Sequence, residues 1–354
     1  MMPSQTREVD STTRKVLYRL DNAVVTPTVV NRADNTFSGC VYDQHGEIVA
    51  ASTRSARNVI WAPANPERFQ ADDDIKTLGG TSIYLGHYTN HYGHFLLETL
   101  ARFWVFELGI PYDRVVFQPF IHSTPKFTLI RRIVRRMRGL TPGDVCLKCF
   151  GIRPRDMLVV DRPLRFTQLL VPSALVEINN CANEEQARTY QRITDYCKSR
   201  VACRSFPERS AGSGRPPRLF LSRSKLKPWG PGRALTNEEQ VEREFAAIGF
   251  QVIHPQCLPF TRQVFLYNRA EIIAGFAGSA MHNSVFMRKG TMAITIGSLR
   301  EGDTNIRNQV LCDGLSGVRS AFISFKGKAI DEQCNIAEFD VDHLRSSLSA
   351  LGLR

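Results

Sequence analysis

The sequence predicts an α/β protein of two Rossmann-like halves that face a cleft, with a β-hairpin extension at the N-terminus. From residue 81 to residue 204, short apolar runs alternate with helix-length segments, an order typical of a parallel sheet covered by helices. The alternation restarts at residue 218, after a stretch at residues 205–217 with the Ser, Gly, Pro and Arg content of a linker. We therefore expect one domain at residues 1–204 and a second at residues 218–354, with a ligand in the cleft between them.

The first domain begins with β-prone runs. Residues 16–30 and 36–42 are followed by a polar turn at 43–46 and a short apolar run at 48–50, which predicts a β-hairpin. Further along, the pattern predicts strands at 82–86, 115–117, 158–161 and 166–172, and helices at 93–108, 125–138 and 183–204.

The second domain repeats the α/β order more regularly. Val241, Phe245 and Ile248 fall on one face of a helix at 237–248. Thr236 and Glu239 predict a capping box at the start of this helix. The rest of the pattern predicts a C-terminal helix, strands at 218–222, 250–254, 272–274 and 292–296, and helices at 260–268 and 279–287.

Composition excludes some classes of protein and raises one question. Hydrophobic residues at 43% and charged residues at 23% are normal for a globular chain and exclude a disordered or fibrous protein. The net charge of +12 indicates an anionic partner, which can be nucleic acid, a lipid surface or a phosphorylated substrate. Residues 1–20 lack the apolar region of a signal peptide, and the 9 cysteines are scattered, so we expect reduced thiols in a cytoplasm. The single CxxC, Cys146 and Cys149, has no second ligand pair at a zinc spacing.

A histidine-rich segment at residues 86–98 (GHYTNHYGHFLLE) joins a predicted strand to a predicted helix. His94 and Glu98 are four residues apart and share a helix face, and a histidine supported by a carboxylate is suited to act as a general base. The other histidines also allow a metal site, but Gly93 favours a helix that starts there and leaves His87 in the loop. The alternative is a capped helix whose histidines only satisfy backbone groups.

A glycine turn at residues 272–283 (IIAGFAGSAMHN) joins another strand to a helix. Glycines let the backbone approach a phosphate, and the N–H groups at a helix start bind anions. The motif is not GxGxxG, and no acidic residue follows the strand that ends at Ile296, so the dinucleotide-binding fingerprint is absent. A tight turn without a ligand is the alternative.

Two groups of basic residues complete the candidates. Arg223 and Lys225 follow the strand at 218–222 and can neutralise a diphosphate, with a solvated basic loop as the alternative. Arginines between Arg131 and Arg138 form a basic stripe at helical spacing that can contact anionic lipid, although a solvated helix face is the favoured interpretation.

Four segments in this order resemble the glycosyltransferase 61 family, whose bacterial members are often described as capsular polysaccharide biosynthesis proteins. The resemblance covers about residues 80 to 300 and is more specific than any single motif. The segments are NHYGHFLLETLAR, RLFLSRSK, LTNEEQVEREFAAIGFQVIHP and CLPFTRQVFLYNRAEIIAGFAGSAMHNSVFM.

The resemblance implies a GT-B architecture and an inverting transfer of a sugar from a nucleotide-diphosphate donor, a UDP-sugar in our expectation, to a cell-surface polysaccharide or glycan. His94 would be the catalytic base and Glu98 its support, with Glu98 acting directly as the alternative. The family often has a histidine where this chain has Ala277, which leaves open whether His282 replaces it. By position, the first domain would be the acceptor side, with Asn90, His91 and Arg102, and the second would hold the donor, with Arg223, Lys225, Asn237, Glu238, Gly278, Ser279, Ala280 and Asn283.

We therefore expect a nucleotide-sugar and a glycan or lipid-linked saccharide acceptor as partners, and a cytoplasmic enzyme with a peripheral contact to the anionic inner face of the membrane. No DxD-like pair lies in the motif regions, so we expect no essential metal and no cofactor besides the donor. A pyruvyl transferase of similar architecture is the nearest alternative, but it would lack the NHYGHF segment. A nucleic-acid-binding protein is the more distant alternative, and the sequence has no reader motif to support it.

Overall fold

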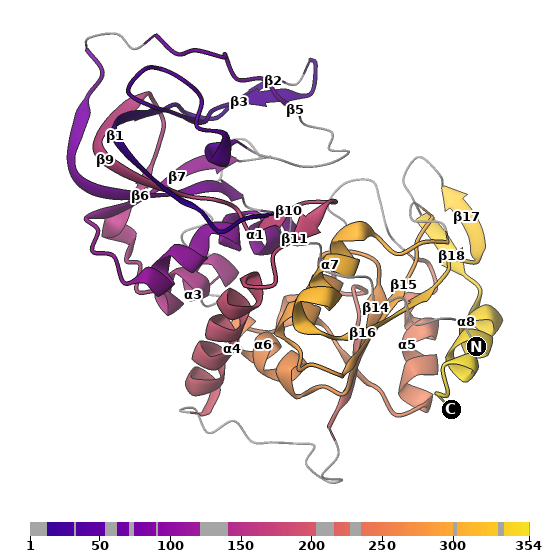
Figure 1. Cartoon of the computed structure of the whole chain (residues 1–354). Helices are drawn as coiled ribbons and strands as arrows, with labels where there is room; N and C mark the ends of the chain where they lie inside the picture. Colours follow the sequence, from indigo (N-terminus) through magenta and orange to yellow (C-terminus); the bar gives the residue numbers. More distant parts are fainter. Residues whose placement is uncertain are drawn as a thin grey trace. The chain divides into compact units, whose positions relative to one another are not determined.

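The computed structural model describes two compact units of mixed α/β structure, one ending at Thr189 and one beginning at Tyr190 (Figure 1). The division falls within helix α4 (Gln186–Ala202). Most of the predicted linker lies outside the described residues, so the predicted domain boundary stays a prediction. The described residues are 13–31, 33–53, 62–70, 74–89, 91–120, 141–202, 216–226, 235–299, 303–331 and 336–353.

The N-terminal unit is built on a six-stranded mixed sheet in the order β4-β1-β9-β6-β7-β8. The four strands β9, β6, β7 and β8 are parallel, as the α/β pattern predicts. The strands are β1 (Leu17–Val25), β4 (Val41–Tyr42), β6 (Thr77–Thr89), β7 (Arg114–Phe120), β8 (Met157–Val159) and β9 (Leu164–Pro172).

The N-terminal strands form less of a separate extension than the sequence predicts. Strand β1 runs antiparallel to β9 over its whole length, from Leu17 opposite Pro172 to Val25 opposite Leu164. The reason is burial, because the apolar end of β1 packs into the same core as β9. The predicted turn is present and ends in a bridge between Tyr42 and Ile48. A small separate sheet contains β2 (Val29–Asn31), β3 (Thr36–Ser38) and β5 (Ala62–Pro63).

The helix predicted at 93–108 is broken into two pieces, α1 (Tyr92–Leu97) and the 3-10 helix η2 (Thr99–Leu108). The break has a local cause, since the Thr99 hydroxyl donates to the backbone carbonyl of His87 in β6 at 2.8 Å. The structure also has a helix that we did not predict, α3 (Pro142–Cys149), which starts with a capping box of Thr141 and Asp144. The predicted helix at 125–138, with the arginines Arg131 to Arg138, lies outside the described residues.

The remaining elements of this unit are short. They are the 3-10 helices η1 (Ala50–Ser52) and η4 (Pro154–Asp156), and the paired strands β10 (Val176–Glu177) and β11 (Cys181–Ala182).

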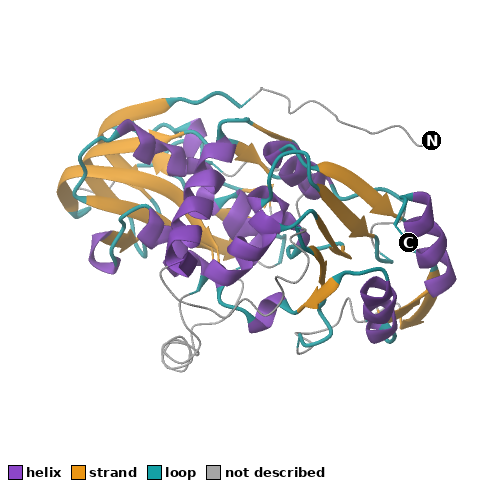
Figure 2. Ribbon diagram, turned by 90° about the horizontal axis from the view of Figure 1, so that it is seen from below, coloured by secondary structure: helices purple, strands orange, loops and turns teal. Residues whose placement is uncertain are grey.

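The C-terminal unit is built on a five-stranded parallel sheet in the order β13-β12-β14-β15-β16. This is the doubly wound order 2-1-3-4-5, in which the direction of strand addition reverses between the first and third strands. Helices α6 and α7 lie on one side of the sheet, and α5 and α8 lie on the other (Figures 1 and 2). The strands are β12 (Arg218–Leu221), β13 (Gln251–Ile253), β14 (Ile272–Phe276), β15 (Met292–Ile296) and β16 (Arg319–Ile323).

The helices predicted at 237–248, at 260–268 and at the C-terminus are present, whereas the helix at Arg307–Ser316 was not predicted. The helix predicted at 279–287 is a 3-10 helix of 6 residues, η6 (Met281–Phe286). None of the helices in the described part of the chain is both long and apolar enough to cross a bilayer. The other elements are α5 (Glu238–Ala247), η5 (Pro255–Cys257), α6 (Phe260–Arg269), α7 (Arg307–Ser316), the hairpin β17 (Gly327–Asp331) with β18 (Ile336–Phe339), and α8 (Val341–Ala350).

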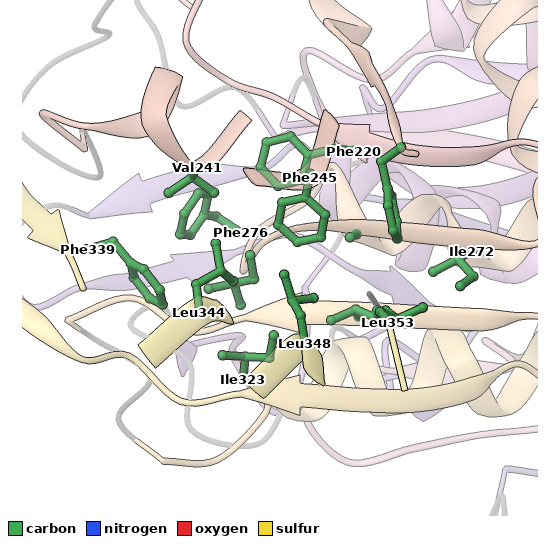
Figure 3. Close-up of a cluster of buried hydrophobic side chains, with 14 residues drawn as sticks. Phe220, Val241, Phe245, Ile272, Phe276, Ile323, Phe339, Leu344, Leu348 and Leu353 are labelled. Atoms are coloured by element: carbon green, nitrogen blue, oxygen red, sulfur yellow. The ribbon is translucent and has the colours of Figure 1, made fainter. Parts of the chain in front are cut away.

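An aromatic core fixes α5 on the sheet. The ring of Phe220 in β12 stacks on that of Phe245 in α5 with centroids 4.4 Å apart, and both side chains are fully buried (Figure 3). Leu344 and Leu348 of α8 pack into the same cluster. Because α5 is held in this way, its first turn is fixed relative to the end of β12.

A first prediction concerns Gly86, at an irregularity where the register between β6 and β7 shifts. Its φ is +77°, and an added Cβ would lie 2.8 Å from Nη1 of the buried Arg102. Gly86→Ala should therefore lower the free energy of unfolding, measured with urea, by at least about 2 kcal/mol. Gly109→Ala is the matched control, because Gly109 has a φ of +62° with nothing near the added Cβ. Its cost should be about 1 kcal/mol, and equal losses would contradict the close approach.

Candidate functional site

Two clusters of polar side chains follow strand ends, one in each unit. The histidine cluster, in the N-terminal unit, comprises His91, His94, Glu98 and the buried Arg102. The switch-point cluster, in the C-terminal unit, comprises Ser222, Arg223, Ser224, Glu238 and Glu242 together with the glycine turn after β14.

The histidine cluster contains a paired imidazole and carboxylate. Nδ1 of His94 lies 2.5 Å from a carboxylate oxygen of Glu98, and the His94 side chain is 32% exposed. The contact expected from the four-residue spacing of His94 and Glu98 is therefore present. Since an ionised carboxylate only accepts hydrogen bonds, Nδ1 carries the proton in the neutral imidazole and Nε2 is the basic nitrogen. The ring of the exposed His91 meets that of His94 edge-on, with centroids 4.9 Å apart.

Arg102 is a buried cation that interacts electrostatically with Glu98. Its side chain is buried, its Nη2 donates to the carbonyl of Ala51 at 2.7 Å, and its guanidinium lies 5.8 Å from the Tyr84 ring centroid. Burial lowers the pKa of Arg102, while the nearby Tyr84 and Glu98 act in the opposite direction. The guanidinium of Arg102 thus interacts favourably with the carboxylate of Glu98.

The predicted acceptor-side residues have different surroundings. His91 is exposed, whereas Arg102 is buried in its own unit, and Asn90 lies outside the described residues. Contact of these residues with an acceptor stays a prediction.

Within the described ranges, no three His, Cys, Asp or Glu side chains are grouped so as to hold a metal ion. The expectation of no essential metal also stays a prediction.

The switch-point cluster lies where the strand order reverses. Arg223 lies two residues after the end of β12, and its guanidinium lies 5.3 Å from the ring centroid of Phe276, the last residue of β14. Its side chain therefore spans the ends of the two strands between which an open α/β sheet binds its ligand. Lys225, two residues on, is exposed.

The glycine turn after β14 does not lead into the helix start that the sequence predicts. Gly278 has a φ of +150°, and Gly278, Ser279 and Ala280 are half-buried. The following helix η6 is too short and too tightly wound to supply the helix-terminal anion site that we expected at Ser279. Asn283 is buried and donates to the carbonyl of Ala280 at 2.8 Å, so it closes the turn.

Asn237 and Glu238, predicted to bind the donor, are engaged by protein groups. The side chain of Asn237 donates to the carbonyl of Phe339 at 2.8 Å and accepts from its N–H at 2.9 Å. Glu238 accepts from the N–H of Arg223 at 2.6 Å. The capping box predicted for Thr236 and Glu239 is wrong, because the Thr236 hydroxyl donates to the carbonyl of Ala337 at 3.4 Å and residue 237 takes the cap position without a side-chain bond.

A buried polar network behind the glycine turn was missed. Nδ1 of His282 lies 2.9 Å from Oε1 of Gln309, and Nε2 of Gln309 lies 2.8 Å from the carboxylate of Asp313. Burial raises the pKa of Asp313 to about 6. The spacing of Gln309 and Asp313 was the available signal, but nothing in the sequence places α7 against η6.

The raised pKa of Asp313 predicts a dependence of stability on pH. An acid whose pKa rises from 3.8 to about 6 on folding binds its proton more tightly in the folded state. Its contribution to stability is therefore greatest below pH 4 and is lost as the pH rises toward 6, by up to about 3 kcal/mol. Asp313→Asn should remove this loss, so the free energy of unfolding of the variant relative to wild type should rise between pH 4 and pH 7. A relative stability that does not change with pH would contradict the prediction.

The sequence matches the family model described as Glycosyltransferase 61 over residues 92–294. The match begins at the first residue of α1 and ends in β15, so it includes His94, Glu98, Arg223 and the glycine turn. Asn90 and His91 lie just outside it. A comparison with curated proteins finds no match.

Proposed function

Because this chain belongs to the glycosyltransferase 61 family and is a glycosyltransferase, we propose that it transfers a sugar, with inversion, from a UDP-sugar to a hydroxyl group of a cell-surface polysaccharide or other glycan. The observation that carries the proposal is the contact between His94 and Glu98, which prepares a basic nitrogen at the end of β6. A GT-B arrangement of the two units is part of the proposal.

His94 is the proposed catalytic base. Its Nε2 takes the proton of the acceptor hydroxyl while the oxygen attacks the anomeric carbon, and the bond from that carbon to the diphosphate breaks on the opposite face. The imidazolium that forms is stabilised by Glu98, whose carboxylate also interacts with the buried charge of Arg102. Glu98 acting directly on the acceptor is the alternative.

Arg223 is the proposed electrostatic partner of the leaving diphosphate. It is placed at the switch point by β12 and Phe276, and a guanidinium forms short, charge-assisted hydrogen bonds to phosphate oxygens. Backbone groups of Gly278, Ser279 and Ala280 and the exposed Lys225 are the proposed further contacts.

The proposal also includes a location. We place the enzyme in the cytoplasm, with a lipid-linked saccharide as one acceptor class and a peripheral contact of Arg131 to Arg138 with anionic lipid. The net charge of +12 supports such a contact. Nothing in the described residues favours pyruvyl transfer or nucleic-acid binding instead.

Replacement of His94 tests the catalytic base. His94→Ala should lower kcat by about 10²- to 10⁴-fold with little change in donor affinity, since the base acts on the acceptor. His45→Ala, at an exposed turn, is the control and should keep wild-type activity. Full sugar transfer by His94→Ala would exclude this role. A larger loss in Glu98→Gln than in His94→Ala would instead favour Glu98 as the base.

A panel of donors tests the proposed donor site. The melting temperature should rise with UDP-sugars more than with GDP-, CMP- or dTDP-sugars. Arg223→Ala should weaken the affinity for the best ligand by about tenfold or more, as expected for a lost charge-assisted contact. Lys225→Ala should weaken it less, because Lys225 is more exposed. The transferase proposal fails if no nucleotide-sugar shifts the melting temperature of the wild-type protein.

A further inference from the structure

The segment Ser222–Ser224 after β12 is held by two carboxylates of helix α5. Glu238 accepts from the N–H of Arg223 at 2.6 Å, and Glu242, one turn further along the helix, accepts from the hydroxyls of Ser222 at 2.6 Å and Ser224 at 2.7 Å. We infer that Glu238 and Glu242 are positioning residues, a carboxylate clamp that holds this segment so that Arg223 is aimed at the diphosphate. The inference rests on the proposed donor site.

The contacts of Glu242 close a ring of hydrogen bonds. The Ser222 hydroxyl has one hydrogen, and its shortest contact, to Glu242, takes it. The oxygen of Ser222 is then left to accept from the N–H of Ser224 at 3.0 Å. The hydroxyl of Ser224 returns to the same carboxylate oxygen. The ring therefore fixes both residues that flank Arg223, and it depends on the acceptor that Glu242 supplies.

Glu238 adds a bond to the backbone of Arg223 itself. Its side chain is buried, and a buried carboxylate needs strong donors to compensate for the lost hydration. The N–H of Arg223 supplies one such donor, and the Ser222 hydroxyl lies 3.3 Å from the same oxygen. The main chain at Arg223 is therefore tied to the first turn of α5, which the stacking of Phe220 on Phe245 fixes on the sheet.

The clamp and Phe276 together define where the guanidinium lies. The clamp holds the backbone of Arg223 at the end of β12, while the ring of Phe276 at the end of β14 lies beneath its guanidinium. An arginine that binds a ligand loses less conformational entropy if it is already held in place. Support from two elements thus prepares Arg223 for an anion before the anion arrives.

Charge alone leads to the opposite expectation, which makes the inference testable. Two carboxylates beside a diphosphate repel it, so removal of one should tighten binding if only electrostatics mattered. If the carboxylates act by positioning Arg223, removal of one should weaken binding even though a negative charge is lost. The direction of the effect separates the two cases.

The experiment measures the Kd of nucleoside diphosphates by calorimetry. UDP, GDP, CDP and dTDP are titrated into wild-type protein, and the tightest is then titrated into the variants. Glu242→Ala should raise the Kd by about tenfold or more, as expected for lost bonds to a charged acceptor. Glu242→Gln should recover much of the affinity, because its amide oxygen still accepts from the serines. The kcat at saturating donor should change little compared with the KM for donor.

Glu239→Ala is the matched control, since Glu239 is exposed on the same helix and its loss changes the net charge equally. Its Kd should stay within about twofold of wild type. If Glu242→Ala lowers the melting temperature strongly, Ser224→Ala opens the same ring with a smaller change and should show an intermediate rise in Kd.

The outcomes separate this inference from the donor site. Binding by Glu242→Ala that is as tight as that of Glu239→Ala, or tighter, overturns the clamp. If Arg223→Ala weakens binding and Glu242→Ala does not, only the clamp fails. If Arg223→Ala also binds normally, or if no nucleoside diphosphate binds the wild-type protein, the donor site fails and the clamp with it.

Discussion

The reversal of strand order between β12 and β14 is the constraint on which the C-terminal unit depends. Strand β13 adds to one side of β12, and β14, β15 and β16 add to the other. The connections after β12 and β14 therefore leave in opposite directions, and an open α/β sheet binds its ligand at the edge where they part. Arg223 and Gly278 are brought to one place by this topology, although 55 residues separate them in the sequence.

Both units place a partly exposed ionisable group beside polar groups that are buried or partly buried. In the N-terminal unit, His94 contacts Glu98, and Glu98 interacts with the buried Arg102. In the C-terminal unit, the backbone N–H of Arg223 donates to Glu238 of α5, and Glu242 of the same helix accepts from the serines on either side. Buried ions are stable only when paired and hydrogen-bonded, so these supports have few alternative arrangements. His94 and Arg223 are consequently held in a defined geometry without a ligand.

Periodicity and residue spacing predict the local features of the fold and of the site. The strands β12 to β15, the helix α5 and the contact of His94 with Glu98 all follow from patterns of fewer than 20 residues. Several of the features that were missed depend on partners far away in the sequence. Strand β1 joins β9, and Asn237 is engaged by Phe339 about 100 residues later. The break at Thr99 has a nearer partner, a carbonyl in β6 that lies 12 residues earlier in the chain.

In the proposed function, the charge of Arg223 also limits how the donor can be held. A diphosphate carries more than one negative charge, and one guanidinium does not neutralise it. In the C-terminal unit, Arg345 is paired with Glu244 at 2.7 Å and Arg218 with Glu271 at 3.3 Å, so these cations are already compensated. The 3-10 turn η6 offers little dipole to add. Under the proposed function, the exposed Lys225 and backbone N–H groups of the glycine turn add to Arg223, because an absent or small side chain lets a phosphate approach closely.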